Sequence, residues 1–204
     1  AWTWFHNDTN GADNWTAPFA FPDGEGYYEF YTRGVDRYLG HYEPAPVVAD
    51  ASCAYEVTLP ISSVDTIYPY WQGLNVNLVA TANDSYPFGV PSHNISGVSA
   101  VEFWYRYSFD NSTGWTAWTL FGTDTDFADG GWNITFTSNY SEGFYEFYSR
   151  AWDYAGNYEP APADNDTSAG IYITTECQMT IQKWPPDTAF NGEVITYLLN
   201  YTNT

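Results

Sequence analysis

The stretch YEFYSRAWDYAGN, from Tyr145 to Asn157, predicts the fold of this chain more clearly than any other part of the sequence. Side chains alternate between the two faces of an extended strand, so residues 145–153 place a mostly apolar set on one face and a polar and aromatic set on the other. On the second face Arg150 stands between Tyr148 and Trp152, a spacing that predicts a cation–π sandwich. Residues 153–157 predict a hairpin turn in which Gly156 adopts a positive φ. The apolar face consists of Tyr145, Phe147, Ser149 and Ala151.

Short strand patterns occur on both sides of this stretch. Residues 74–80 alternate between apolar and polar types, residues 101–108 are rich in aromatic and β-branched side chains, and residues 168–174 are expected to form a closing strand. Glycine and proline recur about every 8–12 residues, and no helical period extends beyond a couple of turns. The pattern therefore predicts an all-β, strand-rich sandwich and not an alternation of strands and helices.

The sequence also repeats itself. Residues 26–33 (GYYEFYTR) match residues 143–150 (GFYEFYSR), and the similarity extends over residues 1–55 and 117–172 at an offset of 116 or 117. The strand patterns that precede the second copy have no counterpart before the first. We therefore predict that residues 1–59 hold the C-terminal half of one unit, that residues 60–174 hold a complete unit, and that residues 175–204 begin a third β-domain or form a donor-strand tail.

The stretch from Tyr145 to Asn157 resembles the penultimate strand and turn of fibronectin type III and related Ig-like modules of prokaryotic surface proteins. In such modules a tyrosine anchors the corner at the start of the strand, a role that the resemblance gives to Tyr145 and Tyr28. Residues 36–41 depart from the Asp-x-Ala-Gly-Asn turn, so a different first hairpin is expected. Residues 179–204 look like the opening of another repeat found in bacterial and archaeal surface proteins. The resemblance implies tandem Ig-like β-sandwich repeats, and the whole is similar to part of an archaeal surface-layer or filament protein.

The first unit, as predicted, lacks the strands that would cover its apolar face. Unpaired strand edges invite pairing, so we expect the missing strands to come either from chain that precedes residue 1 or from a neighbouring subunit by β-augmentation. Residues 179–182 and 193–201 are the predicted donors. Their assembly positions are Met179, Ile181, Val194, Thr196 and Leu198.

Charge excludes one class of partner. The chain has 5 Lys and Arg against 25 Asp and Glu, a formal net charge of −20. Binding to phosphate backbones needs clustered cations, so we expect no nucleic acid partner, and an anionic membrane surface is disfavoured for the same reason. No apolar run approaches the roughly 20 residues of a membrane helix, so no direct membrane insertion is expected in this segment.

The Asn-x-Ser/Thr pattern is the strongest compositional signal. It occurs nine times, several times more often than chance predicts, and indicates an extracellular, N-glycosylated surface. The two cysteines, Cys53 and Cys177, suit an oxidising compartment. If the units stack in line the two lie too far apart for a local bridge, so we expect a disulfide between subunits or one formed by folding back of the third unit. The predicted glycosylation sites are Asn7, Asn14, Asn83, Asn94, Asn111, Asn133, Asn139, Asn165 and Asn200.

No catalytic motif is evident, and the prediction is a protein that is not an enzyme. His6, His41 and His93 have no partners at zinc-ligand spacing, and no nucleophile elbow occurs. Calcium is the one cofactor candidate. Asp124, Asp126 and Asp129 place carboxylates in a loop that ends in glycine, although the position of an EF-hand's closing glutamate is Thr135. A solvated loop with Asx-turns stays open as the alternative. A second candidate set lies at the hinge that follows the strand: Asp153, Asn157, Glu159, Asp164 and Asp166.

Together these features predict a non-enzymatic structural subunit of a glycosylated extracellular filament or surface layer. Its partners would be copies of itself, joined through β-strand and aromatic contacts, and its own N-linked glycans. The alternative is a cell-surface adhesin or carbohydrate-binding module that uses Trp115, Trp118 and Trp132 as a sugar platform. A third interpretation is an accessory domain of a secreted hydrolase, which predicts a catalytic domain elsewhere in the gene.

Overall fold

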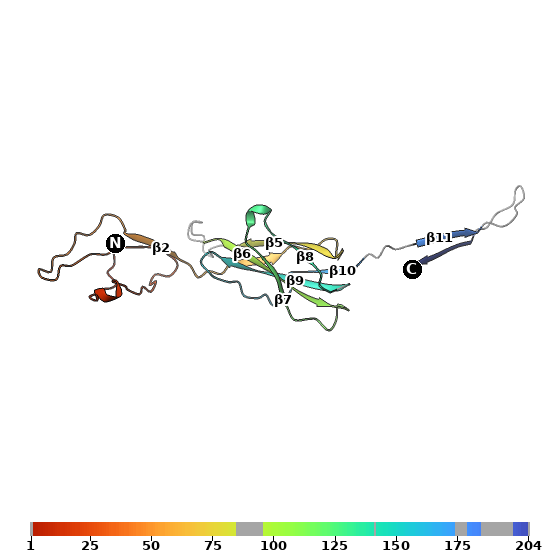
Figure 1. Cartoon of the computed structure of the whole chain (residues 1–204), viewed down its shortest axis with the longest axis horizontal. Helices are drawn as coiled ribbons and strands as arrows, with labels where there is room; N and C mark the ends of the chain where they lie inside the picture. Colours follow the sequence, from red (N-terminus) through yellow and green to blue (C-terminus); the bar gives the residue numbers. More distant parts are fainter. Residues whose placement is uncertain (1, 85–95, 141, 174–178, 185–197, 204) are drawn as a thin grey trace, which may run out of the picture.

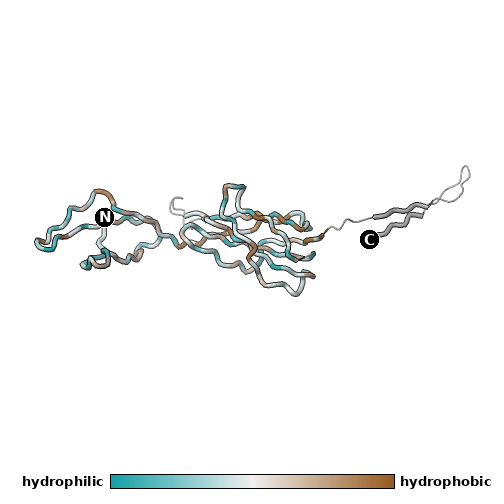
Figure 2. Tube along the Cα trace, in the orientation of Figure 1, coloured by the Kyte–Doolittle hydropathy of each residue, from teal (hydrophilic) through white to brown (hydrophobic). Residues whose placement is uncertain are grey.

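The protein is all-β. A computed structural model describes residues 2–84, 96–140, 142–173, 179–184 and 198–203. In these residues the regular structure consists of β-strands and two 3-10 turns, η1 (Gly11–Asp13) and η2 (Phe127–Asp129). No helix in the described residues has the length and apolarity to cross a membrane. Along the tube in Figure 2 apolar positions fall in short stretches between polar ones, as expected for strands with one buried face.

Three groups of strands follow one another along the long axis of the molecule (Figure 1). The N-terminal segment, residues 2–59, contains the antiparallel pair β1 (Gly26–Phe30) and β2 (Ala51–Tyr55). The central unit, residues 60–173, contains β3 to β10. Beyond it β11 (Met179–Trp184) pairs with β12 (Leu198–Asn203) in an antiparallel hairpin.

The central unit has two sheets. The larger has the order β4-β10-β9-β6-β7, with only β4 and β10 parallel, and the smaller has the antiparallel order β3-β5-β8. The strands of the larger sheet are β4 (Trp71–Gln72), β6 (Val98–Ser108), β7 (Thr119–Asp124), β9 (Gly143–Asp153) and β10 (Thr167–Ile171). Those of the smaller sheet are β3 (Ile61–Val64), β5 (Asn75–Asn83) and β8 (Trp132–Thr137).

The buried faces of the two sheets share one hydrophobic core. Phe136 of the smaller sheet lies with its ring centroid 5.0 Å from that of Tyr105 and 5.1 Å from that of Phe147, both in the larger sheet. The alternation predicted for residues 145–153 is confirmed, because the side chains of the predicted apolar face are at most 1% exposed. The closing strand predicted over residues 168–174 is present as β10 but ends at Ile171, and residue 174 lies outside the described residues. These strands form because β-branched and aromatic residues at every second position can be buried together on one face.

The two stretches of similar sequence make the same contacts. Arg33 Nε donates to the carbonyl oxygen of Glu43 at 2.6 Å, and Arg150 Nε donates to that of Glu159 at 2.8 Å. In both stretches the backbone N–H two residues after the phenylalanine of the strand donates to a later aspartate: Thr32 to Asp50 and Ser149 to Asp166.

The turn at residues 36–41 is closed by the same type of backbone hydrogen bond as the turn at residues 153–157, but it contains one residue more. The N–H of Asp36 donates to the carbonyl oxygen of His41 at 3.0 Å, as the N–H of Asp153 does to that of Asn157 at 3.2 Å. The departure expected at residues 36–41 therefore consists of a longer turn, in which the Asp36 carboxylate accepts the N–H groups of Tyr38, Leu39 and His41. Gly156 has φ 91°, the positive value predicted for it.

Candidate functional site

Three buried carboxylates meet where the N-terminal segment joins the central unit. Glu56 follows β2 in the connection to β3, Asp84 follows β5, and Asp153 ends β9. One oxygen of each lies within 4.8 Å of the others, and the residues are only 8%, 4% and 3% exposed. In the described residues no other group of three or more metal-ligating side chains converges in this way. We call these three residues the junction cluster.

Each carboxylate of the junction cluster is oriented by backbone N–H groups. Ser96 donates to Glu56 Oε2 at 2.7 Å, and Gly97 donates to Asp84 Oδ2 at 2.7 Å. These bonds use one oxygen of each group. The second oxygens, Glu56 Oε1 and Asp84 Oδ1, are buried and have no hydrogen-bond partner among the described residues. Buried oxygens of charged groups are costly when left without a partner.

Asp153 has a different role, because it anchors the turn after β9. Its Oδ1 accepts the N–H of Asn157 at 2.7 Å, and its Oδ2 accepts the Asn157 side-chain amide at 2.8 Å. The same amide lies 3.4 Å from the carbonyl oxygen of Glu56. The turn of the central unit therefore contacts the connection from the N-terminal segment directly.

The electrostatics of the junction cluster are unfavourable to three negative charges. Burial raises the pKa of Glu56 and of Asp84, and the nearby charge of Asp153 raises both further. Glu25, which binds the N–H of Val57 at 2.6 Å, adds to the negative potential on Asp84. In the described part of the chain, none of the cluster carboxylates is paired with a lysine, arginine or histidine.

An open hollow adjoins the junction cluster on the side of the central unit. Asp84 and Gly97 are among the residues that line it, with Phe127 and Trp132. Asp84 therefore lies at the boundary between the buried cluster and solvent.

The structure separates the residues of the predicted calcium loop. Asp124 accepts the N–H groups of Asp126 and Asn133 at 2.9 and 2.8 Å, and Asp126 accepts that of Ala128 at 2.9 Å, so both carboxylates act in local turns. With Asp129 they form no converging group. The Asx-turn alternative describes this geometry. Calcium binding at this loop stays a prediction.

The hinge set divides into two. Asp153 and Asn157 belong to the junction, whereas Glu159 accepts hydrogen bonds from Ser62 Oγ and from the N–H of Ala151. Asp166 accepts the N–H of Val64 at 2.8 Å. Sequence reasoning did not find Glu56 or Asp84. The one sequence feature that could have indicated them is that each acid directly follows a strand, at the end where the N-terminal segment joins the central unit.

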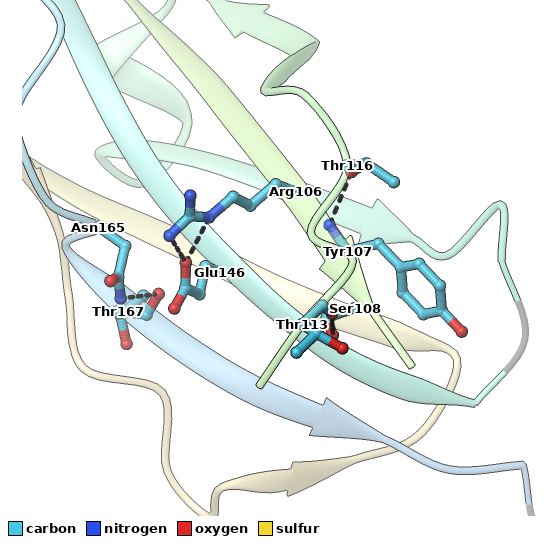
Figure 3. Close-up of polar contacts among 8 residues, drawn as sticks. All are labelled: Arg106, Tyr107, Ser108, Thr113, Thr116, Glu146, Asn165 and Thr167. Carbon is cyan, nitrogen blue, oxygen red and sulfur yellow. Dashed lines mark hydrogen bonds and ion pairs between the residues drawn. The ribbon is translucent and has the colours of Figure 1, made fainter. Parts of the chain in front are cut away.

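The outer face of the larger sheet carries a network of aromatic rings and charges. Arg106 of β6 forms an ion pair with Glu146 of β9 at 2.5 Å (Figure 3), and its guanidinium lies 5.0 Å from the ring of Trp115 and 4.7 Å from that of Trp118. Trp118 in turn packs edge-on against Tyr148 at 4.4 Å, so that Tyr148 is buried.

The segment after β6 is held against the strand by hydrogen bonds that Figure 3 shows, from Tyr107 N–H to Thr116 Oγ1 and from Ser108 Oγ to the carbonyl oxygen of Thr113. This positions Trp115 and Trp118 over the sheet.

Two sequence predictions about aromatic residues need correction. The guanidinium of Arg150 lies over the ring of Tyr158 at 3.6 Å, and not between Tyr148 and Trp152, because Tyr148 stacks with Trp104 and Trp152 stacks with Tyr158. Trp132 is only 5% exposed in the core, so it cannot be part of a sugar platform. Trp115 and Trp118 are half-buried against Arg106.

The predicted glycosylation sites differ in accessibility. The side chains of Asn133 and Asn165 are half-buried, and their amide nitrogens donate to the carbonyl oxygens of Gly131 at 2.7 Å and Thr167 at 3.1 Å (Figure 3 for Asn165). Asn94, and the side chain of Asn200, lie outside the described residues. The exposed sites are Asn7, Asn14, Asn83, Asn111 and Asn139.

The remaining predicted sites are described only in part. Cys53 is exposed on β2, opposite Tyr28, and is a thiol in this structure, while Cys177 lies outside the described residues. Met179, Ile181 and Leu198 lie in β11 and β12, as the strand prediction requires. Val194 and Thr196 lie outside the described residues.

Comparison with known proteins gives no match: no family model, no curated protein and no solved structure is similar to this chain.

Proposed function

We propose that this chain is a structural building block of a glycosylated extracellular assembly, a filament or surface layer, built from tandem Ig-like β-sandwich units. One observation supports this most strongly. The N-terminal segment contains the aromatic cluster of a sandwich core with only one pair of strands beside it. Further strands would cover such a surface, and this proposal assigns them to a neighbouring copy.

The aromatic cluster of the N-terminal segment has the geometry of a core. Phe19 lies edge-to-face with Phe5 at 5.0 Å, with Phe30 at 4.9 Å and with Tyr28 at 5.6 Å. Yet Phe5 is 46% exposed, and the other three are half-buried. Contiguous apolar side chains that remain partly exposed are a feature of interaction surfaces.

The strand edges support the same proposal. In the described residues β1 pairs with β2 on one edge, whereas β9, its counterpart by sequence, pairs with both β10 and β6. The second edge of β1 therefore offers backbone donors and acceptors to an incoming strand.

We assign the incoming strands to the β11–β12 hairpin of another copy. An isolated two-stranded hairpin is marginally stable in water, so β11 and β12 need a further sheet, as β1 and β2 do. The high negative charge and the exposed sequons favour an extracellular setting in which glycans cover the flanks. The protein needs no catalytic group for this role.

The test is the association state of residues 1–204, measured by size-exclusion chromatography with light scattering over a hundredfold range of concentration. We expect oligomers or filaments, the latter visible by electron microscopy. The double change Phe5→Ser and Phe19→Ser should shift the protein to monomer. The matched control Phe127→Ser, which alters an exposed ring of the central unit, should leave association unchanged. A monomer at every concentration contradicts the proposal.

Glycopeptide mapping of native material tests the extracellular part. We expect high occupancy at the five exposed sequons and low occupancy at Asn133 and Asn165, whose amides are engaged within the chain. Unmodified asparagines throughout would contradict an extracellular glycoprotein.

A further inference from the structure

We propose that Glu56, Asp84 and Asp153 bind a calcium ion that ties the N-terminal segment to the central unit. This inference rests on the junction cluster alone and holds whether or not the chain assembles.

The first argument is the pair of buried oxygens without partners. Glu56 Oε1 and Asp84 Oδ1 belong to residues that are 92% and 96% buried, and neither accepts a hydrogen bond in the described part of the chain. In the junction cluster one oxygen of each carboxylate lies within 4.8 Å of the others, a separation at which one ion can contact all three residues. A cation between them would satisfy the two oxygens and offset the charge of the cluster at once.

The chemistry of the donors selects the ion. All three ligands are carboxylate oxygens, with no histidine or cysteine in the group, which favours a hard cation over zinc or copper. The Asn157 side-chain amide donates to Asp153 Oδ2 at 2.8 Å and lies 3.4 Å from the Glu56 carbonyl oxygen, so further oxygen atoms of the chain surround the cluster. Calcium accepts such an irregular set of six to eight oxygens, with water completing it, whereas magnesium demands a nearly ideal octahedron.

The position of the ligands gives the ion a mechanical role. Glu56 lies in the connection from β2 to β3, whereas Asp84 and Asp153 end two strands of different sheets in the central unit. An ion held by all three fixes the connection against the end of the sandwich. The orientation of the N-terminal segment then depends on calcium.

The experiment uses residues 1–204 freed of metal with a chelator and titrated with calcium chloride by calorimetry. We expect one site with a Kd of about 10⁻⁴–10⁻³ M, the range of extracellular calcium modules. At ten times the Kd, the melting temperature of the central unit should rise by about 5 °C. Magnesium chloride at the same concentration should have a clearly smaller effect. Protease cleavage within residues 56–59 should slow when calcium is bound.

The decisive variant combines Glu56→Gln with Asp84→Asn and leaves Asp153 in place as the turn anchor. It should lose calcium binding at least tenfold, while its melting temperature in chelator equals or exceeds that of the unmodified protein because the repulsion between charges is relieved. That comparison shows that the variant folds. The matched control, Asp126→Asn with Asp129→Asn in the predicted calcium loop, should bind as the unmodified protein does.

Three results would overturn the proposal. The first is a melting temperature that calcium does not change and that rises only as the pH is lowered, which would mean that protons neutralise the cluster. The second is calcium binding that survives in the Glu56→Gln/Asp84→Asn variant. The third is binding that disappears in the loop control instead.

Discussion

The N-terminal segment and the central unit contain matching aromatic clusters that differ in what covers them. The ring centroids of Phe5 and Phe19 are 5.0 Å apart, and those of Phe121 and Phe136 are 4.8 Å apart. Phe19 is 4.9 Å from Phe30 in the first cluster, and Phe136 is 5.1 Å from Phe147 in the second, again between ring centroids. Phe136 is nevertheless fully buried, whereas Phe19 is half-buried.

The comparison shows that ring geometry and burial have separate origins. The distances between the rings are determined within each repeated stretch, by β1 or β9 and the segment that precedes it. Burial comes from β3, β5 and β6, which have no counterpart among the described residues of the N-terminal segment. Most of the stabilisation from an aromatic cluster therefore depends on strands distant in sequence.

The largest difference is expected for phenylalanine-to-alanine changes in the two clusters. Phe136→Ala should lower the free energy of unfolding of the central unit by about 3–5 kcal/mol, because it creates a cavity in a closed core. Phe19→Ala should lower the free energy of unfolding of the N-terminal segment by less than about 1 kcal/mol, because water already reaches the surroundings of this ring. Urea unfolding followed by near-ultraviolet circular dichroism measures both. Equal losses would show that the N-terminal cluster is as well covered as the central one.

The corner tyrosines give a smaller contrast. The Tyr145 hydroxyl is buried, bonds with Ser138 and donates to the carbonyl oxygen of Tyr140, and burial raises its pKa to about 12. Tyr145→Phe should cost about 1–2 kcal/mol, because it removes hydrogen bonds at a part-buried site. Tyr28 donates to the carbonyl oxygen of Gly24 at 2.6 Å at an exposed site, so Tyr28→Phe should cost less than about 0.5 kcal/mol. A spectroscopic pH titration should also show a tyrosine that ionises at about pH 12, and this phase should be absent in Tyr145→Phe.

The smallest contrast concerns two turn aspartates. Backbone N–H groups lower the pKa of Asp110 in the central unit and of Asp36 in the N-terminal segment below the ordinary 3.8. A lowered pKa in the folded state stabilises the fold above the unfolded value, and the stabilisation is lost as the pH falls through the folded value.

The melting temperature of Asp110→Ala should therefore lie below that of the unmodified protein at about pH 7, and the gap should close towards about pH 2. Asp36→Ala should leave the central transition unchanged and instead speed amide exchange at Leu39, whose N–H the carboxylate accepts. A gap that widens in acid would contradict the role assigned to Asp110.

Local pattern was enough to predict much of the central unit. Alternation identified β9 and its buried face, and the sequence of the turn predicted the positive φ of Gly156. The same local information failed for Arg150. Its aromatic partner, Tyr158, lies across a hairpin, and the rings on its own strand had already stacked with Trp104 and Tyr158.

The junction cluster could not be predicted because its members come from distant parts of the chain. Glu56, Asp84 and Asp153 each follow or end a strand, which is a common position for an acid. Only the pairing of β5 with β3 and of β6 with β9 brings the ends of these strands to one place. Asp124 and Asp126 showed a clearer motif in sequence, yet their geometry is that of ordinary turns.

The sequence by itself determined the all-β class and the alternating faces of the strands, because both depend on residues a few positions apart and on the two-residue period of a strand. Only the tertiary structure decided which aromatic cluster is covered, that Trp132 is core, and that three acids meet in a buried space. Those outcomes depend on the packing of two sheets against each other. Packing brings together residues that are far apart in the sequence, and no repeating pattern along the chain indicates which of them will meet.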